Sequence, residues 1–306
     1  MLLSVVAGLA LTQGPSYPSV FRAVFEDRPR QLVIVLNRKP GATPVGFVFH
    51  PEIGAIRKVW SGTIDYRGKV YDFSQNNSRT EGKTLWEAPS EAIRLPDQAD
   101  RATEWQKEGV TFTNSAWQFT GDNAKLTSPI FALGTMQAVY VGFDETSTTT
   151  AFTLRLLQSD GRELTKFESS TAQDSNWQWN YKKIPFFPGD LRLEVSQRQK
   201  SDQKRIRNLR VFGDYPVWSI RRGETSEVTE TELKGYRING PESITVTCQI
   251  GAALVDWEPN ITPTGWSETF RVRGVRAGQQ LTLFRPGLDD QPIAMTNGEY
   301  VLRHTR

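Results

Sequence analysis

The chain of 306 residues is 38% hydrophobic and carries 37 Lys and Arg against 34 Asp and Glu, a formal net charge of +3. That apolar content is enough for packed cores in two or three domains and argues against a disordered chain. The basic residues are scattered among nearly as many acidic ones, which argues against nucleic-acid binding, because such binders concentrate positive charge on one face. A single cysteine and two histidines exclude an internal disulfide and disfavour a transition-metal centre.

The chain begins with an apolar run from Leu2 to Leu11, followed by Thr-Gln-Gly-Pro. The run is too short to cross a bilayer as a helix, which takes about 20 residues. Its length and small residues fit a signal peptide, so residues 1–14 are interpreted as a signal-like segment and the protein as periplasmic or extracellular. No Lys or Arg precedes the run, so retention stays open. A retained segment would bring residues 2–11 against a partner or a membrane surface.

Residues 15–90 predict the first part of a β-rich domain, followed by a polar linker. Strand candidates lie at 31–36, 45–49, 56–66 and 69–73, and Gly68 supplies the turn between the last two. The linker, residues 91–108, is rich in charge and is expected to include one helical turn.

Residues 109–214 predict a β-sandwich, because many short strands follow one another at regular spacing with no helical period. The candidates are 110–113, 116–119, 124–126, 138–143, 151–157, 177–184, 191–195 and 206–212. Residues 217–306 predict a further β-rich stretch, with strands at 244–250, 268–275 and 280–284. Cys248 falls in the first of these and is expected to be a strand residue without a chemical role.

Two segments resemble one β-rich domain of exported bacterial proteins. Residues 29–73 carry its most specific pattern, Trp60, Ser61, Gly62, Asp65, Gly68 and Tyr71. Residues 235–284 resemble the continuation of the same domain. That domain is often fused to c-type cytochrome or sugar-dehydrogenase modules. The resemblance implies a bacterial envelope protein with redox or polysaccharide-degrading partners, and it implies no haem here because the chain lacks a CxxCH motif.

Between them, residues 117–131 resemble the opening of jelly-roll modules of the MAM and carbohydrate-binding type. Together the resemblances imply that the jelly roll is inserted into the other domain, so that residues 17–90 pack with 217–306. The predicted fold is all-β: a jelly-roll-like central β-sandwich with a second β-rich domain built from the N- and C-terminal segments.

The residues offer little for catalysis. A Ser-His-acid triad would need His50, at a strand end, or His304, near the C-terminus where strands fray. A glycoside hydrolase needs two converging carboxyls, whereas Asp144 and Glu145 are adjacent and point to opposite sides of a strand. Neither catalytic residues nor a metal site is predicted, although a structural calcium stays open. Its oxygens would come from Asp122, Asn123, Asp144 and Asp214.

Trp177, Trp179 and Tyr181 form the best binding candidate, because alternate residues of a strand share one face. They could fill the sandwich core or form an exposed platform for sugar rings or a protein. Trp257 and Trp266 flank a Pro- and Gly-bearing segment, which is expected to be a loop and a second contact surface.

We therefore expect a non-catalytic envelope protein that binds or scaffolds a glycan or a protein partner. The alternative is a cofactor-free accessory subunit of a membrane-associated, cytochrome-linked electron-transfer complex on its periplasmic side. A glycoside hydrolase is a third, weaker alternative.

Overall fold

The computed structural model describes residues 19–26, 28–36, 42–65, 78–89, 102–146, 152–169, 178–185, 187–197, 205–240 and 242–305. Antiparallel strands dominate these residues, together with one 3-10 turn, η1 (Ala102–Glu104), so the predicted all-β fold is confirmed. Within the described ranges, no helix has the length and apolar character needed to cross a membrane. The signal-like segment, the strand expected at 69–73 and most of the linker lie outside the described residues.

The N-terminal strands form a five-stranded meander, sheet A, that curls back on itself. Its strands are β1 (Ser19–Phe25), β2 (Arg28–Leu36), β3 (Val45–His50), β4 (Ala55–Asp65) and β5 (Arg79–Glu87), in that spatial order. Phe25, the last residue of β1, forms a parallel bridge to Ser78, and the Glu26 amide donates to the Ser78 carbonyl at 3.1 Å. The first strand therefore meets the start of the fifth.

This curl gives sheet A two buried faces, which explains the continuous apolar run in β2. Leu32 and Ile34 point outward into the main core of the molecule. Val33 and Val35 point inward, where they pack with the fully buried ring of Trp60. That ring lies directly over Gly46, the residue paired with Trp60 across the sheet.

The C-terminal residues form two further antiparallel sheets. Sheet D has the order β18-β17-β23-β24, with β17 (Trp218–Arg222), β18 (Thr225–Val228), β23 (Gln279–Leu283) and β24 (Ile293–Met295). Sheet E has the order β19-β20-β21-β22-β25, with β19 (Thr231–Gly240), β20 (Ser243–Ile250), β21 (Ala253–Thr262), β22 (Gly265–Arg273) and β25 (Gly298–Thr305).

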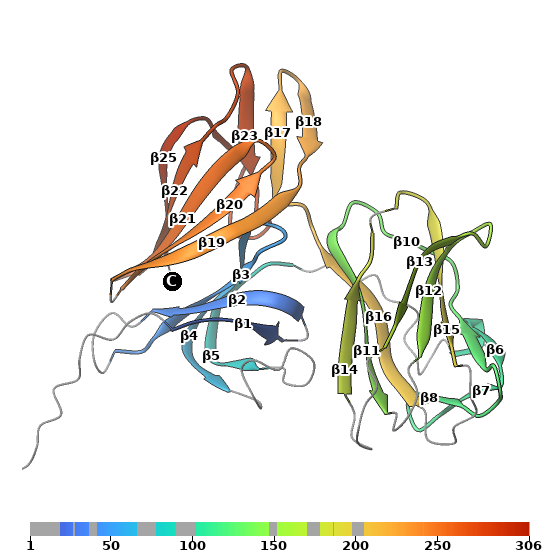
Figure 1. The fold of residues 1–306 in the computed structure, drawn as a ribbon. Helices are drawn as coiled ribbons and strands as arrows, with labels where there is room; N and C mark the ends of the chain where they lie inside the picture. Colours follow the sequence, from blue (N-terminus) through green and yellow to red (C-terminus); the bar gives the residue numbers. More distant parts are fainter. Residues whose placement is uncertain are drawn as a thin grey trace, which may run out of the picture.

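Sheets A, D and E share one hydrophobic core, and we call them together the first module. The core holds side chains from residues 32–86 and from residues 217–295. Phe49 of β3 stacks on Trp257 of β21 with ring centroids 5.0 Å apart, and Trp218 Nε1 donates to the Gly54 carbonyl at 3.0 Å. Sheet E accordingly lies across the curled sheet (Figure 1).

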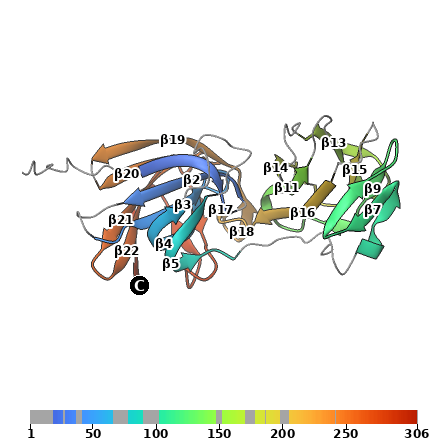
Figure 2. The same cartoon turned by 90° about the horizontal axis from the view of Figure 1, so that it is seen from below.

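The middle of the chain forms the second module, a sandwich of two sheets. Sheet B has the order β13-β12-β15-β9-β6 with β10 also on β15, and sheet C has the order β14-β11-β16-β8-β7. The strands are β6 (Gln106–Glu108), β7 (Val110–Thr113), β8 (Ala116–Phe119), β9 (Lys125–Thr127), β10 (Phe131–Ala132), β11 (Gln137–Thr146), β12 (Thr153–Gln158), β13 (Glu163–Glu168), β14 (Gln178–Lys183), β15 (Asp190–Ser196) and β16 (Arg205–Asp214). A separate core fills the space between the two sheets. Figure 2 shows the two modules side by side.

Two expectations about the C-terminal part are wrong. The segment between Trp257 and Trp266 is not a loop but a tight hairpin, in which β21 pairs with β22 as far as Thr262 and Gly265. Pro259 is tolerated there because the pairing of β21 with β20 ends at Trp257, so the missing N–H breaks no bond on that side. His304 does not lie in a frayed end, because it pairs with Trp266 inside β25.

Candidate functional site

Only part of the aromatic row expected on β14 belongs to the residues that the structure describes. Trp177 falls outside the described residues, and for Trp179 the backbone alone is described, paired with Asp144 of β11. Tyr181 pairs with Gly142 and is half-buried. It belongs to the face of sheet C that points away from the sandwich core, because its ring meets Tyr140 edge-on at 6.2 Å in a cluster separate from that core.

Trp257 and Trp266 are placed far from this row, in sheet E. Each is only 2% exposed, and their rings contribute to the core of the first module. Trp266 stacks on His304 at 5.0 Å. The structure therefore does not bring the two aromatic candidates together, and the second pair has no exposed ring face to offer.

The most concentrated set of functional groups lies where the modules meet. Asp214, the last residue of β16, places its carboxylate against the curled sheet. Arg28 Nη1 donates to Asp214 Oδ1 at 2.8 Å, and Arg57 Nε lies 3.1 Å from the same oxygen. Each of these three side chains is at most 17% exposed. Burial would raise the pKa of Asp214, but the two guanidinium groups outweigh it and hold that pKa below its usual value.

His50 completes this junction from the end of β3. Its Nε2 lies 3.4 Å from Asp214 Oδ2, and its Nδ1 accepts the Glu52 amide at 3.2 Å. An accepting Nδ1 assigns the proton to Nε2 and leaves the ring neutral. Complete burial lowers the pKa of His50 to about 4, against the opposing charge of Asp214.

Further contacts fix the two modules to each other around this centre. Lys183 of β14 lies 2.9 Å from Glu52. Val24 of β1 packs on Tyr140 and Phe212 of sheet C, whose rings stack at 5.7 Å. The interface combines buried charge with aromatic packing.

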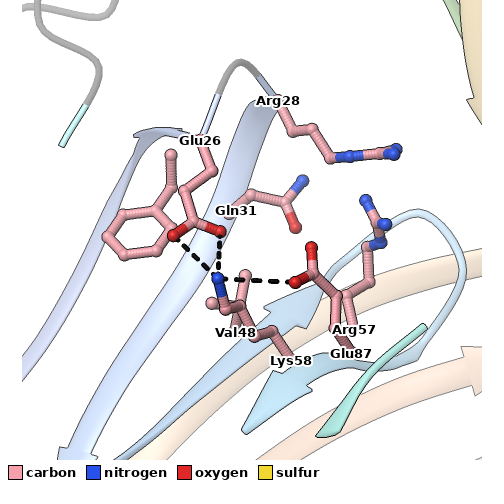
Figure 3. Close-up of a pocket in the computed structure, with 8 residues that line it drawn as sticks. Glu26, Arg28, Gln31, Val48, Arg57, Lys58 and Glu87 are labelled. Carbon is pink, nitrogen blue, oxygen red and sulfur yellow. Dashed lines mark hydrogen bonds and ion pairs between the residues drawn. The ribbon is translucent and has the colours of Figure 1, made fainter. Parts of the chain in front are cut away.

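Next to the junction, an ion-pair cluster closes the curled sheet (Figure 3). Lys58 Nζ lies 2.8 and 2.9 Å from the two carboxylate oxygens of Glu26 and 3.5 Å from Glu87. The same Glu26 carboxylate accepts the amide and the hydroxyl of Thr80 at 3.0 and 2.7 Å. Because Glu26 follows β1 while Thr80 lies in β5, these bonds hold the first and fifth strands together. Glu26 adopts a left-handed φ of 49° at this point.

The pocket beside this cluster is small. Its lining includes Glu26, Arg28, Gln31 and Lys58, and its volume is ≈ 20 Å³. That volume suits about one water molecule, whereas pockets for drug-sized ligands measure roughly 300–1,000 Å³. Burial would raise the pKa of Glu26, but the bonds from Lys58 and Thr80 outweigh it and lower that pKa. The cluster is therefore a closed structural ion pair.

A second buried network lies in the first module around Glu268. Arg285 Nη1 donates to both Glu268 oxygens at 2.6 and 2.7 Å, Trp257 Nε1 donates at 2.7 Å, and His304 Nε2 lies 2.8 Å away. Arg285 also donates from Nε and Nη2 to the two carboxylate oxygens of Asp289. Burial would raise the pKa of Glu268, but Arg285 and His304 lower it. A carboxylate engaged in this way is poorly placed to accept a proton from a substrate.

The adjacent acidic residues Asp144 and Glu145 do not converge on one site. Asp144 accepts from Arg207 and Asn208 on the outer face of sheet C, whereas the adjacent Glu145 is fully buried and accepts from Ser169 and Asn180. Within the described ranges, no three or more His, Cys, Asp or Glu side chains are arranged so that they could hold a metal ion. Of the four residues considered for calcium, Asp214 is engaged by arginines instead.

Sequence reasoning missed the junction residues Arg28, His50 and Arg57 and the role of Asp214. A signal was present: Gln31, Arg57 and Lys58 are polar residues directly beside apolar runs in the sequence. Such residues are buried only when they find partners. Nothing in the sequence says that the partner of Arg57 lies 157 positions further along the chain.

No family model matches this chain, and a search of curated proteins also found no match. The resemblances described above therefore stay predictions.

Proposed function

We propose that the protein is a non-catalytic envelope protein that scaffolds two β modules in a fixed arrangement and binds a glycan. The observation that carries this proposal is the junction at Asp214. Burying charge costs free energy, and leaving one member of a buried ion pair without its partner costs about 3–5 kcal/mol, so the junction disfavours any arrangement that separates Asp214 from Arg28 and Arg57. A fixed arrangement suits a protein that presents a binding surface.

The outer face of sheet C supports a glycan as the ligand. Tyr140 and Phe212 are buried inside the junction, and Tyr181 of β14 extends their cluster to the half-exposed outer face of the sheet. Position 179 comes next on the same strand, paired with Asp144. Aromatic rings beside polar groups suit a sugar, which has apolar faces and hydroxyl edges. Asp144 and Arg210 provide such groups on this side of the sheet, since Arg210 lies over Phe212 at 5.2 Å.

The test is a glycan array probed with the whole protein and with Trp179→Ala. We expect binding to a limited set of glycans and a loss of about tenfold or more in the variant, from the removal of one stacking ring. Tyr236→Ala is the matched control, because Tyr236 is an exposed aromatic residue on β19 of the other module.

Two results would contradict the proposal: no glycan bound, or equal binding by Trp179→Ala and the unchanged protein. Co-purification with a haem-containing membrane complex would favour the accessory-subunit alternative in its place.

A further inference from the structure

The free edge of sheet E at β25 is open to another strand. In the described part of the chain, the sheet ends with β25, and no strand pairs with its outer side. The strand is regular, since residues 298–305 pair with 272–265 without a register shift. An edge of this kind presents unpaired backbone groups and acts as a template for a further strand.

The opposite edge of the same sheet is built differently. The pairing of β19 with β20 shifts register twice, near Leu233 and near Ile238, and Lys234 and Arg237 lie along the strand. Bulges and charges of this kind prevent edge-to-edge association. Sheet E therefore protects one edge and leaves the other regular.

The side chains of β25 are complementary to those of a second β25. Glu299 and Arg303 lie two positions on either side of Val301, which is 50% exposed. In an antiparallel pair centred on Val301, the two valines face each other and each Glu299 lies opposite Arg303 of the second copy. Opposite charges directly across such a pair are stabilising. A two-fold axis produces this contact twice.

Glu299 and Arg303 are also exposed enough to form ion pairs with a second copy. Glu299 accepts from Arg271 at 2.8 Å but remains about half exposed, so it can bridge a second guanidinium. Arg303 is exposed and makes no ion pair with the described residues. We propose that the protein forms a two-fold symmetric dimer through β25, which joins the two five-stranded E sheets into one continuous sheet. The proposal is independent of glycan binding, because β25 lies in the other module from sheet C.

The first experiment measures mass in solution by sedimentation equilibrium, over an about 100-fold range of protein concentration, since dimerisation follows mass action. We expect a concentration-dependent dimer. Val301→Lys places two ammonium groups opposite each other and should weaken the dimer at least about tenfold. Leu254→Lys is the control: it changes an exposed apolar residue of sheet E on the internal strand β21 and should leave the dimer intact.

A charge-reversal pair tests the register. Arg303→Glu gives a chain with two acidic positions, and Glu299→Arg gives one with two basic positions, so each should dimerise poorly alone. An equimolar mixture restores complementarity at both contacts and should recover the dimer, seen by energy transfer between labelled chains. Thermal melts confirm that each variant is folded.

A monomer at every concentration would overturn the proposal. Undiminished dimerisation of Val301→Lys, or a mixture of folded charge variants that stays monomeric, would overturn it as well.

Discussion

Acidification should weaken this protein well above the pH at which carboxylates titrate, because of His50. In the unfolded chain a histidine has a pKa near 6.5, whereas burial at the junction lowers the pKa of His50 to about 4. Between these values the unfolded chain binds a proton that the folded protein does not. The contribution of His50 to stability is therefore complete above pH 6.5 and is lost as the pH falls toward 4.

The two pKa values set the size of the effect. Each unit of difference corresponds to about 1.4 kcal/mol, so the free energy of unfolding should fall by about 2 kcal/mol at pH 5 and by about 3 kcal/mol at pH 4. The lowered pKa values of Glu26 and Asp214 add to the loss only near and below the range where free carboxylates titrate. The interval from pH 6.5 to 5 thus isolates the histidine.

The assay is urea unfolding followed by tryptophan fluorescence at pH 7, 6 and 5, for the unchanged protein and for His50→Gln. The variant should be less stable at pH 7 but nearly independent of pH in this interval. A flat profile for the unchanged protein would refute the reasoning, and so would a slope that His50→Gln retains.

Two substitutions test the packing and the second buried network. Gly46→Ala should lower the free energy of unfolding by about 1–3 kcal/mol, because the added Cβ would lie 2.1 Å from the buried Trp60 ring. Gly240→Ala is the control, since its Cβ meets no atom within 4 Å and should have little effect. Thermal melts compare the two variants. Glu268→Gln should lower the free energy of unfolding, measured in urea, by about 3–5 kcal/mol, because it removes the charge that faces the buried Arg285. A loss below about 1 kcal/mol would mean that Asp289 alone compensates the charge of Arg285.

The sequence predicted the strands well where the pattern was local. The strand candidates at 110–113 and 116–119 match β7 and β8, and the apolar runs at 31–36 and 45–49 fall in β2 and β3. It failed at 257–266, where Pro and Gly suggested a loop although the segment forms a hairpin. Local turn residues were outweighed there by the burial of Trp257 and Trp266.

The junction could not be predicted because it depends on pairings between distant residues. Arg57 is the extra residue of a bulge in β4, and Asp214 is the last residue of β16. Their meeting depends on how two separately folded modules dock. No local pattern of charged residues in the sequence indicates how the modules dock.

The division of the first module has a consequence for how the protein is made. Its core needs residues 32–86 from before the sandwich and residues 217–295 from after it. During synthesis the N-terminal strands leave the ribosome first, yet the bond from Trp218 to Gly54 must wait for 164 more positions. The sandwich has its own core and can fold in that interval, because domains generally fold as units. Throughout it, the outward apolar face of β2 and β3 has no partner strand to cover it. That face therefore stays exposed to water until the residues after 217 have been made.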